Sequence, residues 1–202
     1  MKSNYSKLLL LALLAIFTLG SCEKDDNDSD KIIVKLGAQD NTSIGAFYSV
    51  SENKVYTQAE ALNNQAKIDL LCFYENTDTH QNMTTISSPG ANITGIFTDD
   101  NGDEYFTSWT TKNTSYFTLP ATDLTVEQFD QLKDGDTVIA SYYDETVTSG
   151  NRKAKVLVVD DIYAFKTQGG IYGLFKVVEL SNPESESGWI KIEIKIASQS
   201  SI

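Results

Sequence analysis

The chain has 202 residues, of which 28 are acidic and 16 are Lys or Arg, so its formal net charge at pH 7 is −12. Nucleic-acid binding needs basic residues clustered on one face, and this composition, with Arg152 as its single arginine, argues against that class. The acidity equally disfavours adhesion of the folded domain to anionic lipid head groups.

The N-terminal region has the layout of a secretory signal. Lys2 and Lys7 make a short positive segment, and residues 8–19 form an almost unbroken apolar run. That run is too short to remain in a bilayer as a spanning helix. Small residues then lead directly into Cys22, so we expect cleavage before this cysteine.

The segment ending at Cys22 resembles the lipobox of bacterial lipoproteins, in which the cysteine is acylated and becomes the mature N-terminus. The acidic residues 23–26 that follow resemble the export tag of Bacteroidota surface lipoproteins of uncharacterised function. The resemblance implies an outer-membrane or cell-surface protein held by acyl chains such as palmitate. Two or more chains anchor stably, at about 0.8 kcal/mol per buried CH2. The alternative is an ordinary cleaved signal followed by a chance cysteine.

Three regions follow from this reading. We expect a signal peptide over residues 1–21, a lipidated, flexible acidic tether over residues 22–31, and a single β domain over residues 32–202. Cys72 is the only other cysteine, so acylation of Cys22 leaves no intramolecular disulfide. Cys72 lies in an apolar run and is expected to act as a small buried hydrophobe.

Apolar runs of strand length predict an all-β fold, mainly an antiparallel sandwich or a barrel-like arrangement of about ten strands with two short helices. The expected strands are residues 32–36, 45–50, 55–56, 67–74, 93–98, 104–109, 137–143, 154–159, 162–167, 171–180 and 189–196. The fourth should lie centrally in a sheet, and its Asp69 is expected to bond nearby backbone N–H groups. In the last strand four isoleucines alternate with Lys191, Glu193 and Lys195, so the charged residues should face solvent.

Three local motifs predict how the chain turns between strands. Thr57 with Glu60, and Thr125 with Gln128, have the spacing of a capping box and predict short helices after each threonine. Between residues 93–98 and 104–109, an acidic segment with Asn-Gly predicts a hairpin turn.

The sequence offers no recognisable catalytic set, so we expect a protein that is not an enzyme and has no cofactor. His80 is the only histidine, and no nucleophile motif surrounds it. A zinc site needs three or four ligands, so we expect no metal. Most acidic pairs are sequence neighbours at turns, and neighbours along a strand point to opposite faces, which does not suit glycoside hydrolysis.

A binding role agrees better with the residues. Trp109 and Tyr116 border a loop, and Trp189 lies on the polar face of its strand, where an aromatic ring suits sugar or peptide recognition. The long polar segment 76–92, with His80 and Met83, is the first candidate for a binding loop. These residues predict a binding module for an extracellular nutrient, either a glycan or a peptide.

Residues 54–73 and 163–196 are similar to haemophore lipoproteins, all-β proteins in which an Asp-containing apolar strand precedes loops that supply haem ligands. In that family two His or Met side chains hold the iron, whereas this chain has His80 and Met83 in one segment and no second histidine. Haem binding is therefore one alternative function. A structural or interaction subunit of an envelope assembly, with an outer-membrane protein as partner, is another.

Overall fold

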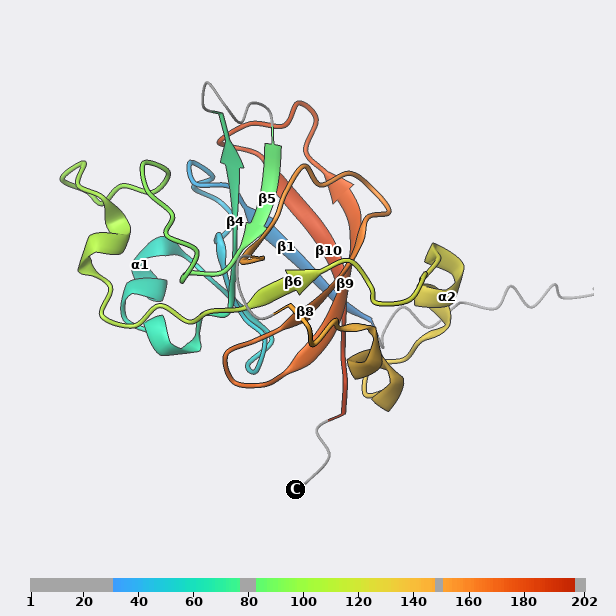
Figure 1. Ribbon diagram of the computed structural model, residues 1–202. Coiled ribbons are helices and arrows are strands. Elements are labelled where there is room, and N and C mark those ends of the chain that lie inside the picture. The colour runs from blue at the N-terminus through green and yellow to red at the C-terminus, as the bar shows by residue number, and fades with distance from the viewer. Residues whose placement is uncertain (1–30, 77–82, 148–150, 199–202) are drawn as a thin grey trace, which may run out of the picture.

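The computed structural model describes residues 31–76, 83–147 and 151–198 (Figure 1). The predicted signal peptide, Cys22, nearly all of the tether and His80 lie outside these residues. Within the described ranges, no helix has the length and hydropathy that crossing a membrane requires.

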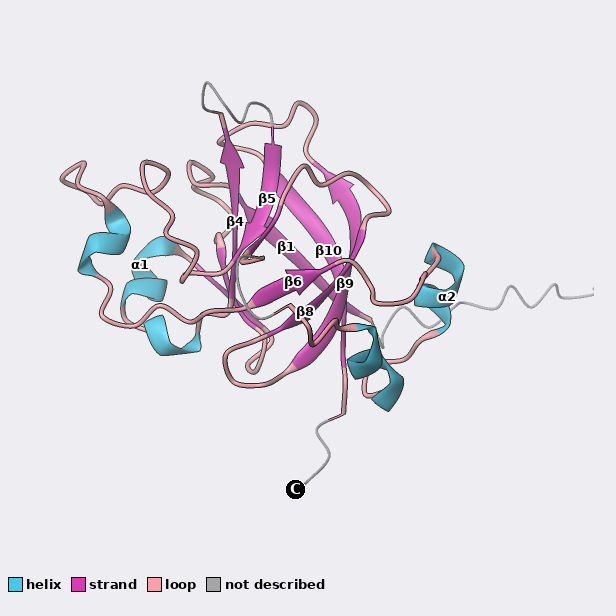
Figure 2. Cartoon of the chain, in the orientation of Figure 1, coloured by secondary structure: helices cyan, strands magenta, loops and turns pink. Residues whose placement is uncertain are grey.

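Ten strands form two five-stranded sheets, which confirms the all-β prediction in its sandwich form; neither sheet closes into a barrel among the described residues (Figure 2). One sheet has the order β1-β10-β9-β8-β6 and the other β3-β2-β4-β5-β7, and all strand neighbours are antiparallel. The strands of the first sheet are β1 (Ile32–Gly37), β6 (Tyr116–Thr118), β8 (Ile162–Lys166), β9 (Tyr172–Leu180) and β10 (Trp189–Ile196). Those of the second are β2 (Phe47–Ser49), β3 (Lys54–Tyr56), β4 (Leu70–Glu75), β5 (Met83–Ser87) and β7 (Lys153–Ala154).

The main core lies between the two sheets. It combines alternate residues of β10, including Ile192 and Ile194, with Phe165 and Phe175 of the first sheet and Cys72 of the second. Cys72 is fully buried, as expected from its apolar neighbours. Burial of these side chains is the main term that stabilises the fold, at roughly 25 cal/mol per Å² of apolar surface.

A helical segment covers the outer face of each sheet, so the sandwich is four layers deep (Figure 1). Helix α1 (Gln58–Leu62), the 3-10 turn η2 (Gln65–Lys67) and the 3-10 turn η3 (Tyr105–Ser108) belong to the side of the second sheet. Helix α2 (Val126–Gln131) and the 3-10 turn η4 (Thr137–Tyr142) lie over the first sheet.

Both predicted capping boxes are confirmed. The Thr57 hydroxyl accepts a hydrogen bond from the backbone N of Glu60 at 3.3 Å, and the Glu60 carboxylate accepts one from Thr57 N at 2.9 Å. Thr125 and Gln128 make the same pair of bonds, at 3.3 and 2.9 Å. These bonds satisfy N–H groups that the first turn of a helix leaves unpaired.

The predicted hairpin is wrong in its strands, although the turn forms. The Asp99 carboxylate accepts hydrogen bonds from the backbone N of Asn101 and Asp103, at 2.8 and 3.0 Å. The flanking segments, however, pair only at the single bridge between Thr98 and Glu104. Their apolar residues instead pack as a cluster on the outer face of the second sheet, which sequence alternation does not reveal.

Three further strand assignments change. Residues 137–143 form the 3-10 turn η4 rather than a strand, and the strand expected at 154–159 shrinks to the two residues of β7. The polar segment 76–92 contains the buried strand β5 between β4 and β7, so a long open loop is wrong over residues 83–89. The polar side chains of Thr84 and Thr85 are typical of a loop in the sequence. In the structure both residues are buried in β5, which pairs with β4 on one side and β7 on the other.

Two of the three charged residues of β10 are buried, contrary to expectation, whereas Lys191 remains partly exposed. Glu193 and Lys195 have exposed fractions of only 3% and 5%. The α2 segment covers them: Lys195 Nζ donates to the backbone O of Leu132 at 2.7 Å and lies 3.0 Å from the Glu193 carboxylate. Lys176 of β9 lies 3.6 Å from the same carboxylate and forms an ion pair with Asp130 of α2. The strand pattern was correct, but it could not show that a helix would dock over the charges.

Candidate ligand-binding groove

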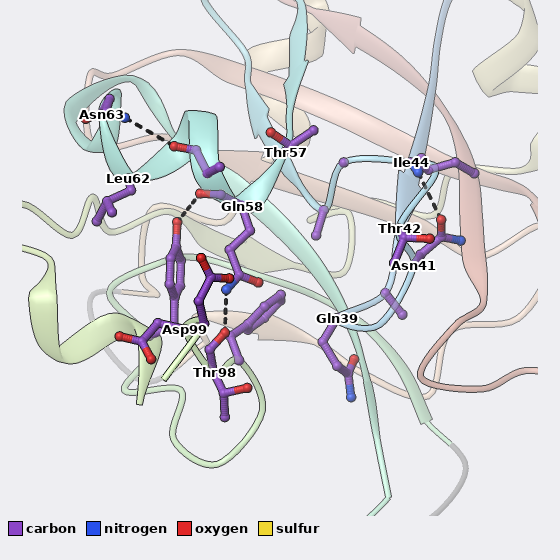
Figure 3. Close-up of a pocket in the computed structure, with 17 residues that line it drawn as sticks. Gln39, Asn41, Thr42, Ile44, Thr57, Gln58, Leu62, Asn63, Thr98 and Asp99 are labelled. Atoms are coloured by element: carbon purple, nitrogen blue, oxygen red, sulfur yellow. Dashed lines mark hydrogen bonds between the residues drawn. The ribbon is translucent and has the colours of Figure 1, made fainter. Parts of the chain in front are cut away.

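A cavity of about 610 Å³ opens beside α1 (Figure 3). Three segments line it: residues 38–46 between β1 and β2, residues 57–63 around α1, and residues 97–100 at the acidic turn, with Tyr105 beside them. We call this space the groove. Its volume lies within the roughly 300–1,000 Å³ of small-molecule sites in proteins.

The loop at residues 38–46 is held rigidly against its surroundings. The side-chain oxygen of Asn41 accepts hydrogen bonds from the backbone N of Ser43 and Ile44, at 3.0 and 2.9 Å, and its amide nitrogen donates to Gly188 O at 3.0 Å. A Cβ on Gly45 would lie 2.2 Å from the backbone O of Tyr56, so only glycine fits there. This wall is therefore preorganised.

Two glutamines fix the walls further, one in the 38–46 loop and one in α1. The side chain of Gln39 makes two hydrogen bonds with the backbone of Tyr74. Its Nε2 donates to Tyr74 O at 2.8 Å, and its Oε1 accepts from Tyr74 N at 2.9 Å. Gln58 donates to Thr98 O at 2.5 Å and so ties α1 to the acidic turn, while the Tyr105 hydroxyl donates to Gln58 O (Figure 3). Burial raises the pKa of Tyr105 to about 12, so this hydroxyl stays a donor at neutral pH.

Several groove side chains remain available to a ligand. Thr42, Thr98 and Asp100 are exposed, and their side chains have no hydrogen-bond partner among the described residues. Leu62 adds an apolar surface with an exposed fraction of 38%. The lining residues include no Lys, Arg, His or Cys, so the free groups are mainly acceptors and hydroxyls on a neutral to acidic surface.

The described residues that were proposed from sequence as ligand contacts lie outside the groove, and the prediction that Trp109 is available to a ligand is wrong. Trp109 has an exposed fraction of 5% and packs in an aromatic cluster, with its ring centroid 5.0 Å from that of Phe106 and 5.8 Å from that of Phe47. Trp109 stabilises the outer layer of the second sheet. The cluster contains the rings of Phe47, Phe97, Tyr105, Phe106 and Trp109.

The other proposed contacts are scattered over the fold. Tyr116 is partly buried against the α2 layer, and Trp189 is partly covered by Lys35, whose Nζ lies 3.5 Å from the ring centroid. Met83 is buried in β5, and His80 lies outside the described residues. Of the described candidates, none of Trp109, Tyr116, Trp189 and Met83 lines the groove. The sequence did show the Thr57 cap and the acidic turn, but not that segments about forty residues apart would meet.

Two buried ionisable groups, Asp69 and Cys72, lie outside the groove. Asp69 is buried and accepts a hydrogen bond from Val50 N at 2.9 Å, in agreement with the backbone role expected for it. Burial raises the pKa of Asp69 to about 6 and also raises the pKa of the Cys72 thiol. In the part of the chain that the structure describes, no three His, Cys, Asp or Glu residues gather in a way that could hold a metal ion.

No family model matches the chain, and neither a curated protein nor a solved structure matches it. What the groove binds must therefore be argued from its own residues.

Proposed function

We propose that this chain is a lipid-anchored protein of the outer membrane or cell surface whose β domain binds a glycan in the groove without transforming it. The observation that carries the proposal is the set of unpartnered polar side chains, Thr42, Thr98 and Asp100, held on preorganised walls next to the apolar Leu62. Sugars present hydroxyl donors and apolar C–H faces together, which suits such a lining.

The backbone of the groove favours a glycan over a peptide. Peptides that add to a protein surface gain affinity mainly from main-chain hydrogen bonds. The 38–46 loop has few free backbone N–H groups to donate to a peptide. Those of Asn41, Ser43 and Ile44 are already bonded within the loop, and that of Asp40 donates to Glu186 O. Side chains are the groups left for recognition.

The acids of the groove support binding rather than hydrolysis. A glycosidase needs two carboxyl groups on opposite sides of the sugar bond, roughly 5 Å or more apart. Asp99 and Asp100 are adjacent in one turn, and an Asp99 oxygen is engaged by two backbone N–H groups of that turn. The groove lining supplies no acid on the facing wall.

The test is a binding screen against immobilised neutral oligosaccharides, with peptides as a second panel. The double variant Thr42→Val/Asp100→Ala removes the polar groups from two walls of the groove. Loss of two ligand hydrogen bonds, at about 1–3 kcal/mol each, should weaken binding at least tenfold. The matched control, Thr122→Val/Asp123→Ala, alters the same residue types at exposed positions near α2 and should bind normally.

If the protein binds peptides and none of the oligosaccharides, the glycan assignment is wrong. If the two double variants bind the oligosaccharide equally well, the groove is not the binding site. The anchor is tested separately. Cys22→Ala should release the protein from the membrane fraction of cells, whereas an unchanged membrane fraction would contradict acylation at this residue.

A further inference from the structure

The described chain holds a second cavity of opposite character. A space of about 490 Å³ is lined by Ala91, Asn92, Asn151, Arg152, Lys153 and Lys155. It thus gathers three cationic side chains and no acid in a protein whose net charge is −12. We call it the basic cavity. Lys67, Lys166, Lys176, Lys191 and Lys195 all pair with acids, whereas no described acid forms an ion pair with the three cations of the basic cavity.

The position of Arg152 is set by backbone contacts. Its terminal nitrogen donates to Gly90 O at 2.7 Å, and its own carbonyl accepts from Ser88 N at 3.0 Å. A guanidinium has five donors in a rigid plane, so one bond to a carbonyl orients the group and leaves others to bind. Arg152 is therefore a fixed donor at one side of the cavity.

Lys153 of β7 and Lys155, which directly follows that strand, line the same space. Lys153 Nζ lies 5.3 Å from the ring centroid of Phe73, a cation–π contact on the outer face of the second sheet. Burial lowers the pKa of Lys153, the charge of Glu75 opposes that shift, and the charge of Lys155 adds to it. Because both lysines line the same cavity, their ammonium groups repel each other, and an anion bound there would relieve that repulsion.

The backbone beside the basic cavity is unusual. Val156 follows Lys155 with a φ of 55°, a left-handed conformation that β-branched residues rarely adopt. Leu157, the next residue, is buried and donates to Thr84 O at 3.3 Å, which holds the segment in place. Strain of this kind persists where surrounding contacts demand it and is common at binding sites.

From this geometry we propose that the basic cavity binds an oxyanion, as a free ion or as the sulfate, phosphate or carboxylate of a small ligand. Arg152, Lys153 and Lys155 hold the oxygens, and the amides of Asn92 and Asn151 lie at the rim. This site is separate from the groove and does not depend on the glycan proposal, because none of its lining residues is shared.

The experiment titrates the purified protein with sulfate, phosphate and glucuronate by calorimetry, in chloride buffers of constant ionic strength. Constant ionic strength separates a defined site from general screening. Lys155→Gln and Lys153→Gln should each raise the dissociation constant at least about tenfold, since each removes a charged hydrogen-bond donor from the anion. The control is Lys133→Gln, an exposed lysine near α2, which should leave the constant unchanged.

Saturable binding of one probe that both cavity variants weaken supports the site, and the preferred probe distinguishes a tetrahedral dianion from a carboxylate. The proposal is overturned if no probe binds saturably in the millimolar range. It is equally overturned if Lys133→Gln weakens binding as much as Lys155→Gln does. Circular dichroism of each variant verifies that the fold is intact.

Discussion

The buried charges beneath α2 make the sharpest prediction for stability. In Glu193→Gln the side chain keeps its size but loses the charge that lies 3.0 Å from Lys195 and 3.6 Å from Lys176. Lys176 retains Asp130 as an acidic partner, whereas Lys195 retains the Leu132 carbonyl and the ring of Phe129, 5.0 Å from its Nζ, and no acid among the described residues. Removing one partner of a buried pair typically costs about 3–5 kcal/mol, because the remaining charge is buried without compensation.

The matched control is Glu179→Gln on the same sheet. Glu179 pairs with Lys191 at 2.6 Å, but the two side chains have exposed fractions of 51% and 33%. A surface pair of this kind contributes about 0–1 kcal/mol. The two substitutions remove the same charge and differ chiefly in the burial of the pair.

Urea unfolding followed by circular dichroism measures both variants. We expect Glu193→Gln to lower the unfolding free energy by about 3 kcal/mol, equivalent to a fall in Tm of roughly 6–12 °C for a domain of this size, with an unchanged denaturant slope. Combining Glu193→Leu with Lys195→Met should recover much of the loss, because an apolar pair replaces the charges. If Glu193→Gln lies within about 1 kcal/mol of Glu179→Gln, the reasoning about buried charge is refuted.

Two further predictions concern buried ionisable groups. The pKa of Asp69 is about 6 in the folded state, above its usual value of 3.8, so folding favours the protonated acid and the stability falls as pH rises from about 4 to 6. In Asp69→Asn the amide oxygen can still accept from Val50 N. The unfolding free energy of this variant relative to wild type should therefore rise by up to about 3 kcal/mol between pH 4 and pH 8, and a difference in unfolding free energy that does not change with pH would contradict this. Cys72 should resist alkylation in the native protein and react on unfolding, because the thiol is fully buried with a raised pKa. Peptide mass mapping measures the labelling, and rapid modification of Cys72 in the native state would show that the core around it opens.

Prediction from sequence succeeded where local chemistry decides the structure. The alternating isoleucines of β10 defined its core-facing side, and Thr57 and Thr125 marked the starts of both helices. It failed where distant segments cover one another. The pattern of β10 is the same whether or not α2 docks over Glu193, and the polar composition of β5 hid a strand with a neighbour on each side.

The groove was missed for the same reason. Its walls come from segments that are separated by many residues, and Gln58 joins two of them through a single side-chain bond to Thr98. The sequence predicted aromatic residues as ligand contacts because they are frequent in binding sites, yet Trp109 packs in the outer layer of the second sheet. The side chains that remain free, such as Thr42 and Asp100, belong to residue types too common at surfaces to single out from sequence.

The most direct test of the groove is a titration of the isotopically labelled protein with a neutral oligosaccharide selected in the binding screen, followed by amide NMR. We expect shifts concentrated in residues 38–46, 57–63 and 97–100, the three segments that line the groove. Saturable shifts confined to other parts of the domain, with these three segments unchanged, would contradict the assignment of the groove as the binding site.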